Sequence, residues 1–120
     1  KTLEDAYNDA KGVTAEFNLN ILKRLNREAG ADFDIAKWKH RAFFNPLDSR
    51  IEMHLESVTN QRVKVDGTSF RFRKDETILT EYSYKYTLEG FEALVSDHYS
   101  VERVWTDRDK IFSVQYLKIR

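Results

Sequence analysis

The sequence contains no cysteine, one proline and only four glycines among its 120 residues. Without cysteine it forms no disulfide and offers no thiolate to a metal ion or to a nucleophilic mechanism. The glycines are dispersed, which excludes a glycine-rich loop such as G-x-G-x-x-G as a device for binding a nucleotide-like cofactor. No apolar run approaches the length of a membrane span. We therefore expect no membrane partner and a cytoplasmic location.

A net charge is also absent, because 20 Lys and Arg residues balance 20 Asp and Glu residues. A domain that binds nucleic acid usually carries an excess of basic residues. The best local candidate is the basic stretch at residues 71–74 with Arg62 and Lys64, in which basic residues alternate with Phe70 and Phe72. We favour a two-sided hairpin whose phenylalanines face the core, and we predict no nucleic-acid partner.

The residues that usually carry catalysis or bind metals are sparse. His40, His54 and His98 are far apart and have no partner at the spacing of metal ligands. No serine lies in a recognisable nucleophile elbow. The sequence therefore predicts no metal site and identifies no catalytic residue.

Apolar residues make up 41% of the chain and aromatic residues 13%, which is typical of a globular domain with one core. The first third has helical character. A short helix runs to about Ala10 and is interrupted at Gly12, and a second helix begins at Val13 and ends near Gly30. Its predicted buried stripe consists of Phe17, Ile21, Leu22 and Leu25. A helical turn is expected at residues 34–39.

After Trp38 the hydrophobic period changes to two, which indicates strands. Strands are predicted at "HRAFFN", "RIEMHLES", "QRVKV", "SFRFR" and "ETILTEYSYKY", with a hairpin turn at Asp66-Gly67. Thr87 caps a further helix, and "VERVWT" and "FSVQYLKI" close the chain as strands. The predicted buried face of that helix is Leu88, Phe91, Ala93, Leu94 and Val95. The order predicts an α+β fold in which N-terminal helices pack on a mostly antiparallel sheet.

The stretch "TEYSYKY" alternates strictly between two kinds of side chain. One face is predicted to carry Thr80, Tyr82, Tyr84 and Tyr86, and the other Glu81, Ser83 and Lys85. From the residues alone, a solvated face is the favoured interpretation for Glu81 and Ser83. Tyr7 and Met53 are then ordinary packing residues.

Three stretches resemble one family. They are "AYNDAKGVTAEFNLNILKRLNREAGADFD", then "RIEMHLES" with "QRVKV", and then "ETILTEYSYKY" with "VWTD" and "FSV". In this order they are similar to the S-adenosylmethionine-dependent histidine-specific methyltransferases that make histidine betaine for ergothioneine. The resemblance covers nearly the whole chain.

The resemblance implies that the chain is the C-terminal part of a Rossmann-like methyltransferase with an inserted substrate-binding domain, an expectation that the missing initiator Met fits. Residues 1–86 would belong to the substrate-binding region, and residues 87–120 would supply the last helix and strands of the methyltransferase fold. S-adenosylmethionine would be bound mainly by a domain upstream. We expect the isolated chain to be inactive, and to self-associate through strands that lack their neighbours.

The family's site residues map onto six positions of this sequence. The resemblance places a Glu and a Ser against the imidazole of the substrate, a Tyr at its amino-acid head, and three further residues along the site. These positions are Glu81 and Ser83, Tyr7, and Met53, Phe17 and Thr14. The implied reaction is trimethylation of the α-amine of histidine, with an amino-acid substrate as the small-molecule partner. Two alternatives stay open: another amine, such as a tryptophan derivative, and a non-catalytic binding or dimerisation module.

Overall fold

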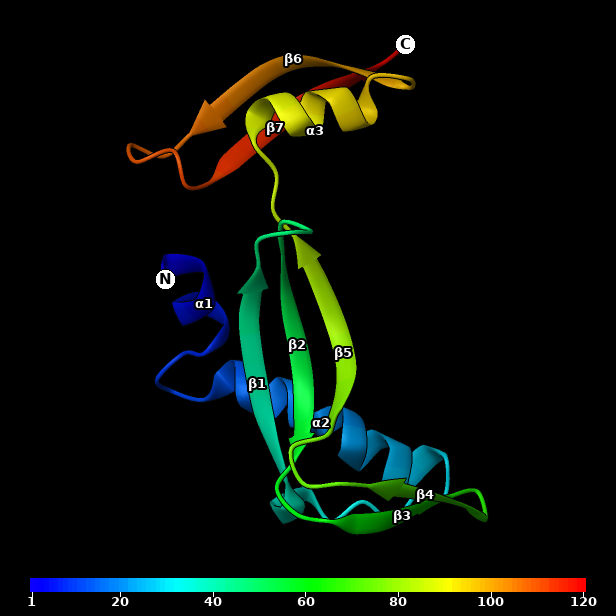
Figure 1. Ribbon diagram of the computed structural model, residues 1–120. Coiled ribbons are helices and arrows are strands. Elements are labelled where there is room, and N and C mark those ends of the chain that lie inside the picture. Colours follow the sequence, from blue (N-terminus) through cyan, green and yellow to red (C-terminus); the bar gives the residue numbers. More distant parts are fainter. The chain divides into compact units, whose positions relative to one another are not determined.

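The computed structural model describes residues 1–120, which form two compact units, residues 1–85 and residues 86–120. The first unit contains α1 (Thr2–Tyr7), α2 (Val13–Glu28), the 3-10 turn η1 (Ile35–Lys37), β1 (Trp38–Asn45), β2 (Arg50–Ser57), β3 (Gln61–Val65), β4 (Thr68–Phe72) and β5 (Thr77–Tyr84). The second contains α3 (Leu88–Val95), β6 (Tyr99–Thr106) and β7 (Ser113–Ile119). Every strand pair is antiparallel, so the predicted α+β class is confirmed (Figure 1).

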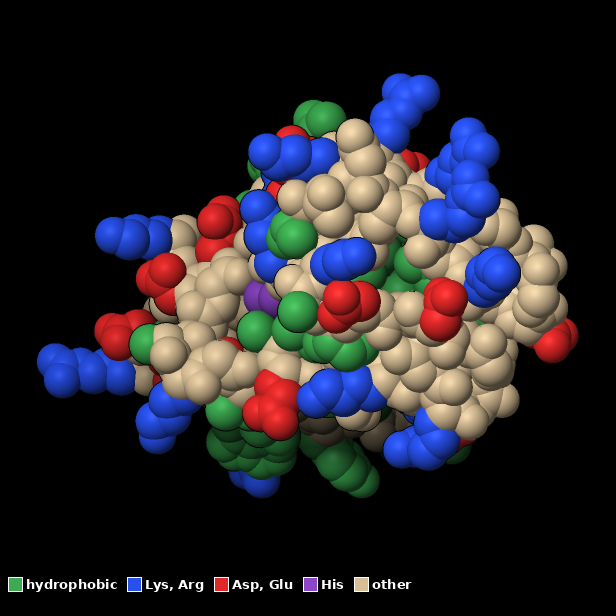
Figure 2. Space-filling view, turned by 90° about the horizontal axis from the view of Figure 1, so that it is seen from below, with side chains coloured by type: hydrophobic (Ala, Val, Ile, Leu, Met, Phe, Trp, Pro, Cys, Tyr) green, Lys and Arg blue, Asp and Glu red, His purple; other side chains and the backbone are tan.

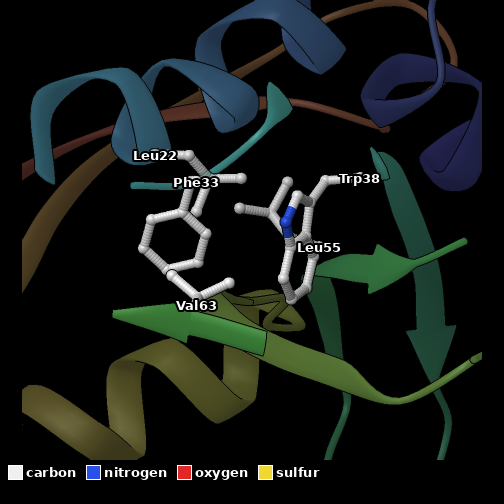
Figure 3. Close-up of a cluster of buried hydrophobic side chains, with 5 residues drawn as sticks. All are labelled: Leu22, Phe33, Trp38, Leu55 and Val63. Atoms are coloured by element: carbon white, nitrogen blue, oxygen red, sulfur yellow. The ribbon is translucent and has the colours of Figure 1, made fainter. Parts of the chain in front are cut away.

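The centre of the first unit is a three-stranded sheet in the order β1-β2-β5. Helix α1 lies beside β1, and α2 crosses the sheet (Figure 1). The main core lies between α2, this sheet and the β3–β4 hairpin, where Leu22, Phe33, Trp38, Leu55 and Val63 cluster (Figure 3). Each fully buried side chain of this kind contributes about 1.5–3 kcal/mol to folding. A second, smaller cluster of Ala42, Ile51 and Met53 packs with Tyr7 and Phe44.

The buried face of α2 differs from the predicted stripe. Leu22 is buried as expected, but Phe17 is 64% exposed and Ile21 is also exposed. The fully buried neighbour on this face is instead Asn18. An amide can be buried there because β1, β2 and β5 supply partners for its hydrogen bonds. Hydrophobic spacing alone does not reveal those partners.

The turns of the first unit follow the predictions. Gly30 ends α2 with a φ of 58°, a left-handed conformation that suits glycine. Asp66 and Gly67 both have positive φ in the β3–β4 turn, as a two-residue type I′ hairpin requires. Of the two phenylalanines on β4, Phe72 packs edge-on against Trp38, with ring centroids 4.9 Å apart, whereas Phe70 is exposed. Phe70 is opposite the buried Val63 in the register but keeps 47% of its surface exposed, so the expectation that both phenylalanines face the core is confirmed for Phe72 only.

A β-bulge changes the face on which Thr80 lies. The register of β2 and β5 shifts between Met53 and His54, so that Met53 is opposite Glu81 while His54 is opposite Leu79. Thr80 lies between these pairs, and its hydroxyl donates to Asn18 Oδ1 of α2 at 2.7 Å. The prediction that Thr80 shares a face with Tyr82 and Tyr84 is therefore wrong. A bulge places two residues opposite one and interrupts the alternation.

The sheet face away from α2 carries a charged and aromatic network. The Arg50 guanidinium lies 3.6 Å from the Tyr82 ring centroid and donates to Tyr84 Oη and to Glu52. Hydrogen bonds from Asn45, then from His54 and Arg50, lower the pKa of Glu52 to about 2. These contacts hold Tyr82 and Tyr84 on the opposite face from Thr80 and explain why the tyrosines need no hydrophobic cover.

The second unit has little core of its own. The Thr87 hydroxyl accepts from the Gly90 N–H at 3.0 Å, so the predicted cap of α3 is confirmed. No side chain of residues 86–120 is buried, and the predicted buried face of α3 is wrong within this unit. One short helix and one hairpin are too small to cover each other's apolar residues. No helix of the structure is long and apolar enough to cross a membrane.

Candidate functional site

Tyr7, Ser83 and Lys85 form a hydrogen-bonded triangle, which we call the Tyr7 cluster. The Lys85 ammonium donates to Tyr7 Oη at 2.8 Å and to Ser83 Oγ at 2.9 Å. The two hydroxyl oxygens are 2.8 Å apart. The Lys85 nitrogen also lies 4.8 Å from the centroid of the Tyr7 ring. Residues 76 and 78 positions apart in the sequence thus meet at one point on the sheet.

The backbone holds both ends of the cluster in place. Lys85 follows β5, and its N–H donates to Ser49 O at 2.8 Å while its carbonyl accepts from the Ser49 hydroxyl at 2.9 Å. Tyr7 ends α1, and its ring packs with Ala42, Ile51 and Met53. Lys85 therefore reaches Tyr7 from a fixed main chain, although its own side chain is long and flexible.

A hydrogen-bond relay through the buried Asn18 fixes the carbonyl of Tyr7. Asn18 donates from Nδ2 to His40 Nδ1 at 3.0 Å and to His54 O at 3.1 Å. Since His40 Nδ1 accepts this bond, its Nε2 carries the hydrogen and donates to Tyr7 O at 2.8 Å. Asn18 has no exposed surface. The relay links α2, β1 and the end of α1, and so positions the residue whose hydroxyl enters the Tyr7 cluster.

The electrostatics of the cluster favour a polarised phenol. The hydrogen bond from Lys85, followed by the one with Ser83, lowers the pKa of Tyr7 below its ordinary value of 10.0. The Glu81 carboxylate acts in the opposite direction and more weakly. Glu81 is directly opposite Met53 in the register, so it lies on the same sheet face as Ser83. The Glu81 carboxylate, which is a hydrogen-bond acceptor, therefore lies on the same face as two hydroxyls that the Lys85 ammonium polarises.

The predicted site residues fall into two groups. The structure brings Tyr7, Met53, Glu81 and Ser83 together around one end of β2 and β5. Thr14 lies in the first turn of α2, where its N–H donates to Asp9 at 3.0 Å. Hydrogen bonds from the Thr14 N–H, then from its hydroxyl and from the Val13 N–H, lower the pKa of Asp9. Thr14 thus stabilises the start of α2 through its hydrogen bond with Asp9. A role in substrate binding stays a prediction for Thr14 and for the exposed Phe17.

Sequence reasoning missed Lys85, Asn18 and His40. A signal for Lys85 existed, because strict alternation in "TEYSYKY" puts it on the face of Glu81 and Ser83. Asn18 and His40 had no such signal, because their partnership joins residues 22 positions apart across two elements. Both are polar residues in the interior of regular elements, where solvent exposure is the usual expectation.

A wide hollow of about 1060 Å³ lies elsewhere in the first unit, at the β3–β4 hairpin. Its lining is largely charged and shares no residue with the Tyr7 cluster; it includes Arg62, Arg71, Arg73, Lys74, Asp75 and Glu76. Acidic and basic side chains are interspersed on the face shown in Figure 2. No group of three or more His, Cys, Asp or Glu residues in the chain could hold a metal ion. The Tyr7 cluster contains or adjoins four of the six predicted site residues and is therefore the candidate site.

Comparison with known proteins identifies the family of the chain. The sequence model of the S-adenosylmethionine-dependent, histidine-specific methyltransferases matches residues 1–119. A histidine N-alpha-methyltransferase of Mycolicibacterium smegmatis (strain ATCC 700084 / mc(2)155) is 43% identical over 94 residues, which are 77% of this chain and 29% of that protein. One of Mycobacterium tuberculosis (strain CDC 1551 / Oshkosh) is 41% identical over 106 residues, covering 85% of this chain and 33% of that protein. The chain thus spans about a third of the length of these curated relatives. It belongs to the family of histidine-specific, S-adenosylmethionine-dependent methyltransferases.

Proposed function

We propose that these residues are the substrate-recognition part of a methyltransferase that acts on the α-amine of histidine and carries it to the trimethylated betaine. The observation that supports this proposal most directly is that Glu81 and Ser83 share one face of the sheet and that Tyr7 of α1 contacts Ser83 on that face by a hydrogen bond of 2.8 Å. Two relatives that are 41–43% identical are named for N-alpha-methylation of histidine.

The chemistry of the side chains suits an imidazole. The Glu81 carboxylate accepts a hydrogen bond from one ring N–H, while the Ser83 hydroxyl donates to or accepts from the other ring nitrogen. Tyr7 then stands at the amino-acid head of the substrate. Met53 is 97% buried behind the cluster, with 3% of its surface exposed, and it packs against Tyr7 as part of the wall.

The residues of this chain do not fit a cofactor site. Gly12, Gly30 and Gly67 have positive φ in three separate turns, and Gly90 lies in α3, so no glycine-rich loop forms. S-adenosylmethionine supplies an electrophilic methyl group in this family, and we assign no residue here to its binding. The task of this chain is to hold the amino acid so that its neutral amine is oriented and water is excluded. We propose that a Rossmann-like cofactor domain is encoded elsewhere in the gene.

Methyl transfer by the complete gene product tests the proposed function. We expect labelled methyl groups from S-adenosylmethionine to appear on histidine, with mono-, di- and trimethylated products in succession, when free amino acids are supplied one at a time. Tryptophan, or a prenylated derivative of it, is the informative alternative substrate. Methylation of this alternative substrate without methylation of histidine contradicts the proposal, as does the absence of transfer to any amine.

We further propose that the 120-residue chain, produced alone, associates with a second copy of itself. Trp105 is 49% exposed, and Phe112 and Ile119 are more exposed still, on a hairpin with free edges. Apolar side chains and unpaired strand edges favour pairing with another chain. Light scattering should therefore give about twice the monomer mass, and Ile119→Lys should shift the mass toward the monomer. Val58→Lys in the first unit serves as the control. A monomer at high micromolar concentration would contradict the proposal.

A further inference from the structure

The hydrogen-bond capacity of the Tyr7 cluster restricts what it offers to a ligand. An ammonium has three N–H donors and a hydroxyl has one donor and two lone pairs. Lys85 directs one donor to Tyr7 Oη and one to Ser83 Oγ, which occupies one lone pair on each oxygen. A single hydroxyl proton lies between the two oxygens, which are 2.8 Å apart. The other hydroxyl proton is free to point at a ligand.

The direction of the shared proton follows from the relative acidity of the two hydroxyls. A phenol is a stronger acid than an alcohol, and Lys85 lowers the pKa of Tyr7 further. Tyr7 is therefore the donor to Ser83. The Ser83 oxygen then accepts twice, from Tyr7 and from Lys85, so both of its lone pairs are filled. Ser83 presents only its own O–H to a ligand.

We propose that Lys85 is a specificity-determining residue that makes this site select the neutral imidazole of its ligand and exclude the imidazolium form. The inference rests on the proposed function, in which the ring lies against Glu81 and Ser83. A neutral ring offers one N–H, which suits Glu81, and one bare nitrogen, which accepts from Ser83. An imidazolium offers two N–H groups, and the second would meet the Ser83 proton and the Lys85 charge.

The other ionisable groups around the cluster do not supply this selection. Within the cluster this is Tyr7, and around it they are His40 of β1, which binds the Tyr7 carbonyl, and Glu81 of β5. Glu81 attracts an imidazolium, and the Lys85 ammonium is the positive charge that opposes it. The neighbouring residues of β2, Ile51 and Met53, carry no charge. Without Lys85, the attraction of the Glu81 carboxylate for an imidazolium is unopposed, and the Ser83 oxygen has a free lone pair that can accept the second ring N–H.

Histidine binding to the complete gene product, measured by calorimetry between about pH 5 and pH 8, tests the proposal. The ordinary pKa of a histidine imidazole is about 6.5. In the wild type, affinity should fall roughly tenfold for each pH unit below that value, because only the neutral ring binds. In Lys85→Met it should fall less than about twofold per pH unit, because the charged ring is then accepted. Lys85→Gln is a second neutral variant if Lys85→Met does not fold.

Two further variants serve as controls for charge and for substitution itself. Lys85→Arg retains the positive charge and should keep the loss of affinity at acid pH. Lys23→Met removes an exposed lysine on α2 and should behave as the wild type. An equal loss of affinity at acid pH in Lys85→Met and the wild type overturns the inference while the proposed function stands. Failure of the wild type to bind histidine at any pH overturns the proposed function, and this inference with it.

A measurement without ligand checks the contact itself. When the six tyrosines of the 120-residue chain are ionised and followed by tyrosinate absorbance, one phenol should titrate at lower pH than the rest. Tyr7→Phe should remove that phenol from the titration, and Lys85→Met should return it to the main group. If Tyr7→Phe removes a phenol from the main group instead, Lys85 does not polarise Tyr7 in solution and the inference is overturned.

Discussion

Replacing Glu81 with alanine in the complete gene product should weaken histidine binding about 100-fold, because a hydrogen bond to a charged group contributes about 1.5–3 kcal/mol. The loss arises at the ring: an imidazole N–H that leaves water would find no acceptor on the sheet face shared with Ser83. The free energy of unfolding should change by no more than about 0.5 kcal/mol, since Glu81 is exposed in β5 and the substitution removes no core contact. Calorimetry at neutral pH measures the first quantity and urea unfolding the second.

Glu92→Ala is the matched control, because Glu92 is an exposed glutamate in α3 of the second unit. It should leave histidine affinity unchanged. The combination of the two variants separates a binding role from a general effect of lost negative charge. If Glu81→Ala lowers the unfolding midpoint sharply and binds histidine as the wild type does, then Glu81 is structural and the proposed placement of the ring is wrong.

Replacing Asn18 with alanine should destabilise the first unit by about 3 kcal/mol. Asn18 is fully buried and serves three partners, namely His40 Nδ1, the His54 carbonyl and the Thr80 hydroxyl. Removal of the amide takes its donor from His40 Nδ1 and from the His54 carbonyl, at about 1–3 kcal/mol each before relaxation, whereas the Thr80 hydroxyl keeps Met53 O as an acceptor at 3.0 Å. Hydrogen exchange of the α2 and β2 amides should accelerate accordingly, and urea unfolding should shift to lower concentration.

The neighbouring residue Asn20 provides the control, because it is an exposed asparagine of the same helix. Asn20→Ala should be neutral or slightly stabilising, since alanine has the higher helix propensity. Asn18→Asp is the sharper test of the relay. An aspartate keeps the acceptor for Thr80 but loses both donors, so it should destabilise by at least about 2 kcal/mol. Equal stabilities for the Asn18→Ala and Asn20→Ala variants would show that the relay contributes nothing.

Much of the secondary structure was predictable because it depends on local geometry. The left-handed backbone at Gly30 and Gly67, the cap by Thr87 and the period of two after Trp38 are properties of neighbouring residues. The candidate site was predictable only through the family resemblance. Alternation placed Glu81, Ser83 and Lys85 on one face, but a solvated face was the favoured interpretation of that pattern.

The sequence by itself determined the type and order of the elements, the hairpin at Asp66-Gly67 and the balance of charge. Only the tertiary structure decided that Asn18 replaces Phe17 in the interior and that a bulge turns Thr80 toward α2. It alone joined Lys85 to Tyr7 across 78 positions. The physical reason is range: backbone sterics and side-chain periodicity act over a few residues, whereas burial of a polar group depends on partners that the folded chain brings from other elements.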